Sequence, residues 1–600
     1  MKLKRIIAYL LLITMILSLG TSCSDKNSSP AISSSPNGFN VNPKDSISVQ
    51  TAFDLFTEKI FEHVVTSDSL TLNYTLEKPE VYNIKMAEPT LGHITKEKAT
   101  KDINDQTTFL TELRTYPKQM LTESQQITYE ILEYMFDPNI NLEDYYYYQE
   151  ILSSTVGFQA QLPILLAEFE FHNKKSVETY LSLLPTVLTY FQEIAQFEIE
   201  KSEEGLFMSN KTADNIIKQC QEFIKDPGNN YLIDIFNDKI KELNYTEKEQ
   251  LELSRRNEDG VKNYIIPAYQ HLIDTLSSLK NTGNNENGLS NYPQGKEYYS
   301  YLVANSTGSD KSIEEIDKLF GQAIQNSMLN MMTIAAKNKD VLTAVVNPDY
   351  SLTDPVEILD YLQEAIENDF PHLNTVNCNI NYVHESLEDF LSPAFFLTPP
   401  IDNYQDNHIY INGGEKHDLS QIFTTIAHEA YPGHLYQNAF YNQQQPSLIR
   451  NIVDFGGYSE GWATYVELYS YSWAGFQEDV VTVLQENMIS TLCLYGKVDI
   501  GVNYYGWTLH DTTKFLNGFG ITSKDDIETI HQSMVEEPSN YMKYVLGYLE
   551  IANLRETAEE KLGEKFNIKD FHDFLLSFGP APFSIISSHM NTWIDKQLTK

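Results

Sequence analysis

The segment FTTIAHEAYPGH, residues 423–434, places two histidines and a glutamate around a Pro-Gly pair. Six helical positions turn the chain through about 600°, so on an unbroken helix His428 and His434 would point roughly 120° apart. Pro432 has no N–H, and its ring collides with the carbonyl group four residues earlier, so the regular helix has to fail here. Gly433 allows backbone dihedrals that other residues rarely adopt. The sequence therefore predicts a distorted helix that returns His434 to the side of His428.

The residue types in this segment are those that hold zinc in catalytic sites, where imidazole and carboxylate donors leave one position open for water. In the familiar arrangement, two histidines four positions apart on one helix bind the ion, and the glutamate after the first histidine is the general base. The longer spacing here is a weaker signal, because two ordinary histidines in a helix and a turn would give the same pattern. Glu429 follows His428 and is the candidate base.

The segment GGYSEGWATYVE, residues 456–467, favours a metal site, because it places a helical carboxylate 26 positions after His434. We expect His428, His434 and Glu460 to bind one Zn²⁺ ion. Glu467 lies seven positions after Glu460, about two turns along the same helical face, and is better suited to orient a ligand or contact the substrate. The assignment of Glu467 as the third ligand stays open as an alternative.

The first part of the chain has a mainly helical pattern. Apolar residues recur at three- and four-residue spacing over long stretches such as 176–202 and 211–224, and turn residues interrupt the pattern at 226–230 and 281–285. Four tyrosines at 145–148 are expected to lie on a buried face rather than to form a ligand platform.

The pattern changes near residue 376. Residues 377–383 and 408–412 alternate like short strands on either side of a Pro-rich segment at 392–400, and a helix is expected from about 418 into the histidine segment. We therefore predict a large, mainly α fold with a small β-sheet next to the metal helix and a substrate cleft. An extended peptide could pair with an exposed edge of the strand at 408–412.

The N-terminus indicates export. Three basic residues among the first five precede an apolar run at 6–19 and small residues before Cys23, as in a secretory signal. The run is too short for a comfortable membrane span. The position of Cys23 resembles a bacterial lipobox, which implies cleavage before Cys23 and lipidation of its thiol. Gly20 departs from the lipobox pattern, and an ordinary cleaved signal is the alternative.

These features give a division into a signal peptide (1–22), a lipidated cysteine with a flexible tether (23–48), a mostly helical region (49–375) and a zinc-binding catalytic region (376–600). The last two regions are expected to form one two-lobed unit, exported and anchored to the outer side of the bacterial cell membrane through lipid alone. The net charge of −40, from 83 acidic and 43 basic side chains, argues against nucleic acid as a partner. The sequence does not indicate an oligomeric state.

HEAYPGH followed by SEGWATYVE resembles the bacterial family called domain of unknown function 885, which is broadly similar to helical zinc peptidases. The resemblance covers about residues 50–600, is strongest after 390, and includes these further segments: SPAFF at 392–396, HIYIN at 408–412, VDIGVN at 498–503, GWT at 506–508, the stretch 544–555, and Phe571-His572. Two segments depart from the family pattern. Asn503 stands where a histidine is usual, and PSNY at 538–541 replaces a usual PGQA.

The resemblance implies zinc-dependent hydrolysis of peptide bonds outside the cytoplasm. Glu429 would take a proton from the zinc-activated water and later pass it to the leaving amine. Tyr544, in the Tyr-x-x-Gly part of the match, would help to stabilise the oxyanion. Arg555 could hold a substrate carboxylate, although an ion pair with Glu556 or another acid is the competing interpretation.

Other polar residues have supporting roles under this interpretation. Asp454 and Asp499 are candidates to orient the histidines, and Asn503 in place of histidine could change transition-state hydrogen bonding or substrate preference. Two alternative functions share the same residues. One is a non-catalytic peptide-binding lipoprotein with a relict zinc site, against which the presence of Glu429 argues. The other is hydrolysis of a non-peptide amide or ester.

Overall fold

The computed structural model describes residues 45–599 apart from 86–87, 139, 284, 347, 384, 386–387 and 389–390. The predicted signal peptide and the predicted lipidation site, Cys23, lie outside the described residues. Among the described residues, no helix is both long and apolar enough to cross a bilayer. The fold is mainly helical with a small three-stranded sheet, as the sequence predicted.

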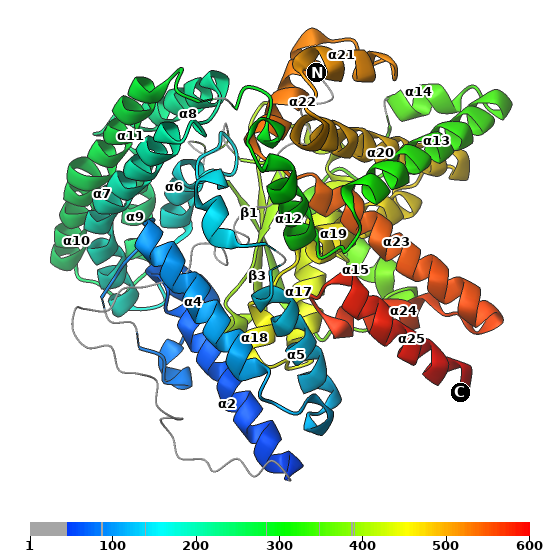
Figure 1. The fold of residues 1–600 in the computed structure, drawn as a ribbon, viewed down its shortest axis with the longest axis horizontal. Helices are drawn as coiled ribbons and strands as arrows, with labels where there is room; N and C mark the ends of the chain where they lie inside the picture. The colour runs from blue at the N-terminus through cyan, green and yellow to red at the C-terminus, as the bar shows by residue number, and fades with distance from the viewer. Residues whose placement is uncertain are drawn as a thin grey trace.

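The helices of the first half of the chain form two groups (Figure 1). α2, α4 and α5 pack around one apolar core, and α6 to α11 pack around another. Their bounds are α2 (Ser46–Val65), α3 (Ser69–Thr75), α4 (Lys96–Leu113), α5 (Glu123–Phe136), α6 (Phe158–Glu168), α7 (Lys174–Glu203), α8 (Asn210–Phe223), α9 (Tyr231–Lys241), α10 (Glu247–Gly260) and α11 (Ile266–Leu279). α7 and α8 confirm the helices predicted at 176–202 and 211–224.

The remaining helices surround the histidine segment and extend to the C-terminus, on the other side of the sheet from α6 to α11 (Figure 1). Their bounds are α12 (Gly295–Thr307), α13 (Ile313–Lys337), α14 (Val341–Val346), α15 (Pro355–Ala365), α16 (Phe423–Glu429), α17 (His434–Gln443), α18 (Leu448–Asn451), α19 (Gly456–Ser470), α20 (Glu478–Ile500), α21 (Leu509–Asn517), α22 (Lys524–Glu536), α23 (Met542–Leu562), α24 (Ile568–Phe578) and α25 (Phe583–Thr599). α19 and α23 approach closely, since a Cβ atom added to Gly461 would lie 2.4 Å from the carbonyl carbon of Gly547.

Polar caps fix the starts of several helices. The side chain of Asn173 accepts the backbone N–H groups of Lys175 and Ser176 at the start of α7. At the start of α13, Ser312 and Glu315 satisfy each other's backbone N–H groups in a capping box. Each such cap removes unpaired N–H groups of the first helical turn, which would otherwise be satisfied only by water.

The sheet has the order β1–β3–β2, with bounds β1 (Asn377–Tyr382), β2 (Ala394–Leu397) and β3 (Asp406–Ile411). β1 pairs with β3 in parallel, and β2 pairs with β3 in antiparallel orientation. The strands predicted at 377–383 and 408–412 are confirmed. β2 was not predicted, and it lies within the Pro-rich segment at 392–400. The prediction that a peptide could pair with an edge of the strand at 408–412 is wrong, since β3 is the central strand and both of its edges are already paired.

The sheet lies between two apolar cores. On one face Phe396, Ile409 and Ile411 join the core around α16 and α19. On the opposite face Phe395 joins the core of α6 to α11, and its ring stacks on that of Tyr410 at 4.9 Å. Alternate residues of a strand point to opposite faces, so β2, which has only four residues, is buried on both sides. Because it contacts both cores, β2 fixes α16 relative to helices α6 to α11. A further core joins residues on both sides of the predicted boundary at 375/376.

Candidate metal centre

The histidine segment forms two helices rather than one distorted helix. α16 ends at Glu429 and α17 begins at His434, with a cis peptide bond between Tyr431 and Pro432 in the connection. Gly433 passes so close to α16 that an added Cβ atom would lie 1.7 Å from the carbonyl oxygen of His428. The predicted disruption at Pro432 is therefore a complete break. Its result is that the first residue of α17 faces the last turn of α16.

Three buried donors converge at this break. Glu460 Oε2, from α19, lies 3.6 Å from His428 Nε2 and 3.5 Å from His434 Nε2. One donor atom from each residue lies within 4.8 Å of the others, and all three residues are buried. Ligand atoms about 2.0–2.2 Å from a tetrahedral zinc ion would stand roughly 3.3–3.6 Å apart. The spacing of the three donors fits a single ion of this kind.

The hydrogen bonding of these groups also fits a cation. Among the described residues, His434 Nε2 and Glu460 Oε2 make no hydrogen bond although both atoms are buried. Buried polar atoms are normally paired, and leaving one unpaired costs about 1–3 kcal/mol. The two atoms face each other at a distance too long for a good hydrogen bond and suited to an ion between them.

The three donors, one carboxylate and two imidazoles, shift one another's pKa values. Burial alone would raise the pKa of Glu460, but the two histidines that face its carboxylate lower that pKa to about 2. Burial lowers the pKa of His434. Burial also opposes charge on His428, yet the facing carboxylates of Glu460 and Glu467 raise its pKa to about 10. In the absence of metal, the positive charge of protonated His428 therefore balances the negative charge of the Glu460 carboxylate. A bound cation would displace that proton.

Glu467 is placed behind one of the donors. Its Oε2 lies 3.0 Å from Nδ1 of His428, while Thr424 donates a hydrogen bond to its Oε1 at 3.4 Å. Glu460 and Glu467, about two turns apart on α19, thus face opposite nitrogens of one imidazole. This carboxylate–histidine arrangement fixes the ring and leaves Nε2 directed at the cluster, the supporting role that the sequence favoured for Glu467.

Glu429 is fully buried beside the donors but is not one of the three. Its Oε2 accepts the backbone N–H of Phe396, in β2, at 3.0 Å, and its Oε1 makes no hydrogen bond among the described residues. Burial raises its pKa to about 8, with the nearby Glu460 adding to the effect. Tyr544, on α23, stacks on His428 with ring centroids 6.4 Å apart. The structure therefore brings both predicted catalytic residues to the donors.

Asp499 and Asn503 belong to a different, structural network. Asn503 donates to Asp499 Oδ1 at 2.7 Å and to the Met534 carbonyl at 2.8 Å, and its own Oδ1 accepts the N–H of Leu289 at 3.0 Å. Asp499 also accepts the N–H of Ser539 at 3.0 Å. These bonds account for the side chain of Asn503 and hold the segment around 539 in place. None of them reaches the three donors.

Arg555 is occupied by neighbours on the protein. Its Nε donates to Glu559 at 2.8 Å and its guanidinium also donates to the hydroxyl of Tyr465 at 3.0 Å. It lies eleven positions after Tyr544, about 16 Å further along α23. The structure therefore agrees with the ion-pair interpretation, with Glu559 as the partner instead of Glu556.

Two charged residues adjoin the cluster without contacting the ligand atoms. Asp454 accepts a hydrogen bond from Ser459 at 3.0 Å and acts on His434 through charge. Lys543, directly before Tyr544, is partly buried, and the charge of Glu460 acts on it. Asp454 was predicted from the sequence as a supporting residue, whereas Lys543 was not, because its only sequence signal is its position beside Tyr544.

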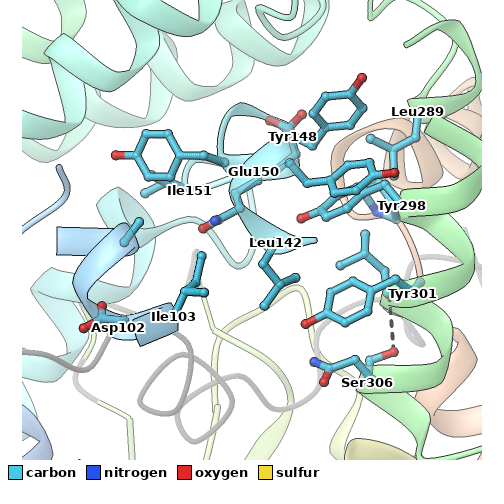
Figure 2. A pocket seen from close by; sticks show the side chains of 18 of the residues that line it. Asp102, Ile103, Leu142, Tyr148, Glu150, Ile151, Leu289, Tyr298, Tyr301 and Ser306 are labelled. Carbon is cyan, nitrogen blue, oxygen red and sulfur yellow. Dashed lines mark hydrogen bonds between the residues drawn. The ribbon is translucent and has the colours of Figure 1, made fainter. Parts of the chain in front are cut away.

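A cavity of about 780 Å³ lies beside the cluster and includes Asp454 and Lys543 in its wall. Figure 2 shows part of its lining, with Tyr148, Tyr298 and Tyr301 around one side and Asp102 on another. Three of the four tyrosines at 145–148 are buried, which confirms the predicted packing, and Tyr145, Tyr146 and Tyr148 also line this cavity. The three donors are not among its lining residues, so Asp454 and Lys543 form the link between the cavity and the cluster.

The fold and the cluster define a large helical protein with a buried His-His-Glu group suited to a metal ion. Residues 82–590 match the family described as bacterial protein of unknown function (DUF885), and the chain belongs to that family. No curated protein matches the chain in sequence.

Two solved structures have a similar fold. A candidate lipoprotein from Colwellia psychrerythraea is 18% identical, with a TM-score of 0.78 over 92% of this chain and 100% of that one. A candidate lipoprotein of unknown function from Shewanella oneidensis is 14% identical, with a TM-score of 0.61 over 91% of this chain and 100% of that one. At these identities the likeness establishes the fold alone.

Proposed function

We propose that this protein is a zinc-dependent hydrolase of peptide bonds. The observation that carries the proposal is the convergence of His428, His434 and Glu460 on one point, with the buried carboxylate of Glu429 beside them. Three protein donors and an open position are typical of catalytic zinc, whereas structural zinc has four protein donors. Glu429 is not needed to hold an ion, so its burial beside the donors favours catalysis over binding alone.

A zinc ion held by these donors would supply a Lewis acid that lowers the pKa of a bound water to about 7 and polarises the scissile carbonyl. Glu467 keeps a proton on Nδ1 of His428, so that Nε2 presents its lone pair. The Phe396 N–H fixes Oε2 of Glu429. The charge of a bound ion would lower the raised pKa of this carboxyl group, so that its unbonded Oε1 could accept a proton from the attacking water. The same carboxyl group then donates that proton to the leaving amine.

Tyr544 completes the proposed machinery. Its ring stacks against His428, which fixes it beside the donors. A phenol O–H in this position donates a hydrogen bond to the oxygen that becomes negatively charged when water attacks the carbonyl.

We further propose that the protein acts outside the cytoplasm as a lipid-anchored protein. The support is the signal-like N-terminus with Cys23 and the description of both similar structures as candidate lipoproteins. Metabolic labelling with a radioactive fatty acid tests this, because Cys23→Ser should abolish the label. Label retained by the serine variant would refute lipidation at this residue.

The hydrolase proposal is tested by metal analysis and peptide digestion on the same preparation. We expect one zinc ion per chain, cleavage of a mixed peptide library, and loss of cleavage with a chelator that is reversed by added zinc. Glu429→Gln should keep the zinc and lose at least about 100-fold in kcat, the scale of general-base catalysis. Glu559→Gln, on the surface of α23, is the matched control and should retain activity.

Each outcome separates the alternatives. Zinc with no hydrolysis, but with peptide binding, would favour a non-catalytic binding lipoprotein. Hydrolysis of small amides or esters without peptide cleavage would favour a different substrate class. Full peptidase activity in the Glu429→Gln variant would refute the assigned mechanism.

A further inference from the structure

Lys543 lies where the cavity meets the candidate metal centre. It is on the first turn of α23, one position before Tyr544, and it lines the cavity. Its aliphatic stem packs over the start of α19, where a Cβ atom added to Gly456 would lie 2.7 Å from Cδ of Lys543. The absence of a side chain at Gly456 therefore leaves the space that directs this lysine toward the cavity.

The ammonium group of Lys543 lacks a close partner, in contrast to the other buried charges around the cavity. Within the described part of the chain, no ion pair or hydrogen bond of Lys543 occurs. The neighbouring charges are paired as follows: Lys98 with Asp102, Glu150 with Lys201, His93 with Glu193, and Glu536 with Asn215 and Gln532. A partly buried ammonium without a partner is costly unless something binds to it.

Three carboxylates act on Lys543 from a distance, but each is already engaged elsewhere. Burial lowers the pKa of Lys543, and Glu460, Asp454 and Glu537 oppose that effect through charge. Glu460 faces His428 and His434, while Asp454 accepts a hydrogen bond from Ser459 and Glu537 accepts hydrogen bonds from Ser153 and Asn540. They favour the charged form of the ammonium without making a hydrogen bond to it, which leaves it open to an anionic group in the cavity.

We propose that Lys543 binds the free carboxylate at the C-terminal end of a peptide, so that the enzyme trims peptides from that end. This inference rests on the proposed hydrolase function and names its substrate class. A terminal carboxylate provides the full negative charge that a desolvated ammonium requires. A carboxylate held at this point, beside Tyr544 and within the field of Glu460, places the last peptide bonds of the substrate at the metal centre.

The rest of the cavity suits the end of a peptide. Its volume of about 780 Å³ is in the range of sites that enclose small ligands, and it is lined by tyrosines, aliphatic side chains and charged residues, most of them acidic. Tyr145 stacks on Tyr298 at 5.3 Å, which makes one wall rigid, and Figure 2 shows Tyr298 and Tyr301 on the same side of the space. Such a wall accommodates a side chain without selecting its charge.

The experiment compares one tripeptide as the free acid and as the C-terminal amide. Binding is measured by calorimetry on zinc-loaded Glu429→Gln protein, which should not turn the peptide over, and hydrolysis is measured on otherwise unmodified protein. Lys543→Met is introduced into both backgrounds, because methionine keeps the stem over Gly456 and removes the charge. Lys96→Met is the matched control, since Lys96 also lines the cavity but is exposed and lies over the ring of Tyr147.

We expect the acid to bind about 10- to 100-fold more tightly than the amide, the scale of a charge-assisted hydrogen bond. Lys543→Met should remove this difference by weakening the acid alone, and kcat/KM should follow mainly through KM. Lys96→Met should preserve the difference in affinity between the acid and the amide. The zinc content should be the same in all proteins.

The outcomes distinguish this inference from the proposed function. Equal binding of acid and amide, or equal losses for both in Lys543→Met, would overturn the role of Lys543, and so would a failure of the acid to bind. Cleavage within longer peptides at sites independent of the C-terminus would leave the hydrolase proposal standing and remove this one. Lysine-dependent binding of the acid without any hydrolysis would support the carboxylate site and refute the hydrolase.

Discussion

Removal of the charge on Glu467 should weaken zinc binding without removing a ligand. The structure places Glu467 Oε2 at 3.0 Å from Nδ1 of His428, with only 18% of the Glu467 side chain exposed, so the contact is largely shielded from water. Partners of this kind behind a metal ligand typically contribute 10- to 100-fold in affinity. That range corresponds to about 1.4–2.7 kcal/mol of binding free energy.

Glu467→Gln should fall near the lower limit, because its amide oxygen still accepts the Nδ1–H. Glu467→Ala should fall near the upper limit, because nothing then orients the ring. The zinc dissociation constant would be measured by competition with a fluorescent chelator at fixed pH, with Glu559→Gln as a surface control. Unchanged zinc affinity in the alanine variant, in a protein that melts at the normal temperature, would refute the inferred role of Glu467.

Three further predictions concern the centre itself. Gly433→Ala should destabilise the fold by about 3 kcal/mol or more and abolish zinc binding, because the Cβ atom of the alanine would collide with the carbonyl group of His428. A normal melting temperature with full zinc content would contradict this prediction. Zinc binding at pH 7.5 should release at least one proton, because the pKa of metal-free His428 is raised to about 10, and the affinity for zinc should rise about tenfold per pH unit between pH 7 and 9. Calorimetry in buffers of different ionisation enthalpy measures this proton release. Zinc binding without any proton release would contradict the prediction. Tyr544→Phe should lower kcat about 10²- to 10³-fold with little change in KM, and an effect confined to KM would assign Tyr544 to substrate binding alone.

The sequence predicted the break at residue 432 because the chemistry of proline is local. A ring without an N–H disrupts a helix in any tertiary setting, so the position of the disruption followed directly. The sequence could not predict that α16 stops completely and α17 starts at His434. That outcome depends on how close Gly433 comes to the carbonyl of His428, which is a three-dimensional contact.

The assignment of Glu460 and Glu467 shows both the strength and the limit of helical spacing. Seven positions place both carboxylates on one face of α19, as periodicity predicts. Which of the two faces both histidines depends on the packing of α16 against α19. A single imidazole bridges the two turns, so that each carboxylate contacts a different nitrogen of His428.

Other features depended on tertiary pairing that one sequence does not reveal. β2 lies between prolines and was not predicted as a strand, and the central place of β3 follows from strand order rather than from its own residues. The hydrogen bonds of Asn503 reach Leu289 and Met534, both distant in sequence. The partner of Arg555 was within reach of sequence reasoning, because residues four apart on a helix face each other and adjacent residues do not.

The most direct test of the account is a crystal structure of zinc-loaded protein with anomalous data collected on both sides of the zinc absorption edge. The account predicts one strong difference peak about 2.0–2.2 Å from the facing nitrogens of His428 and His434 and from a carboxylate oxygen of Glu460. A peak held by other residues, or none at this point in protein that was given zinc, would contradict it.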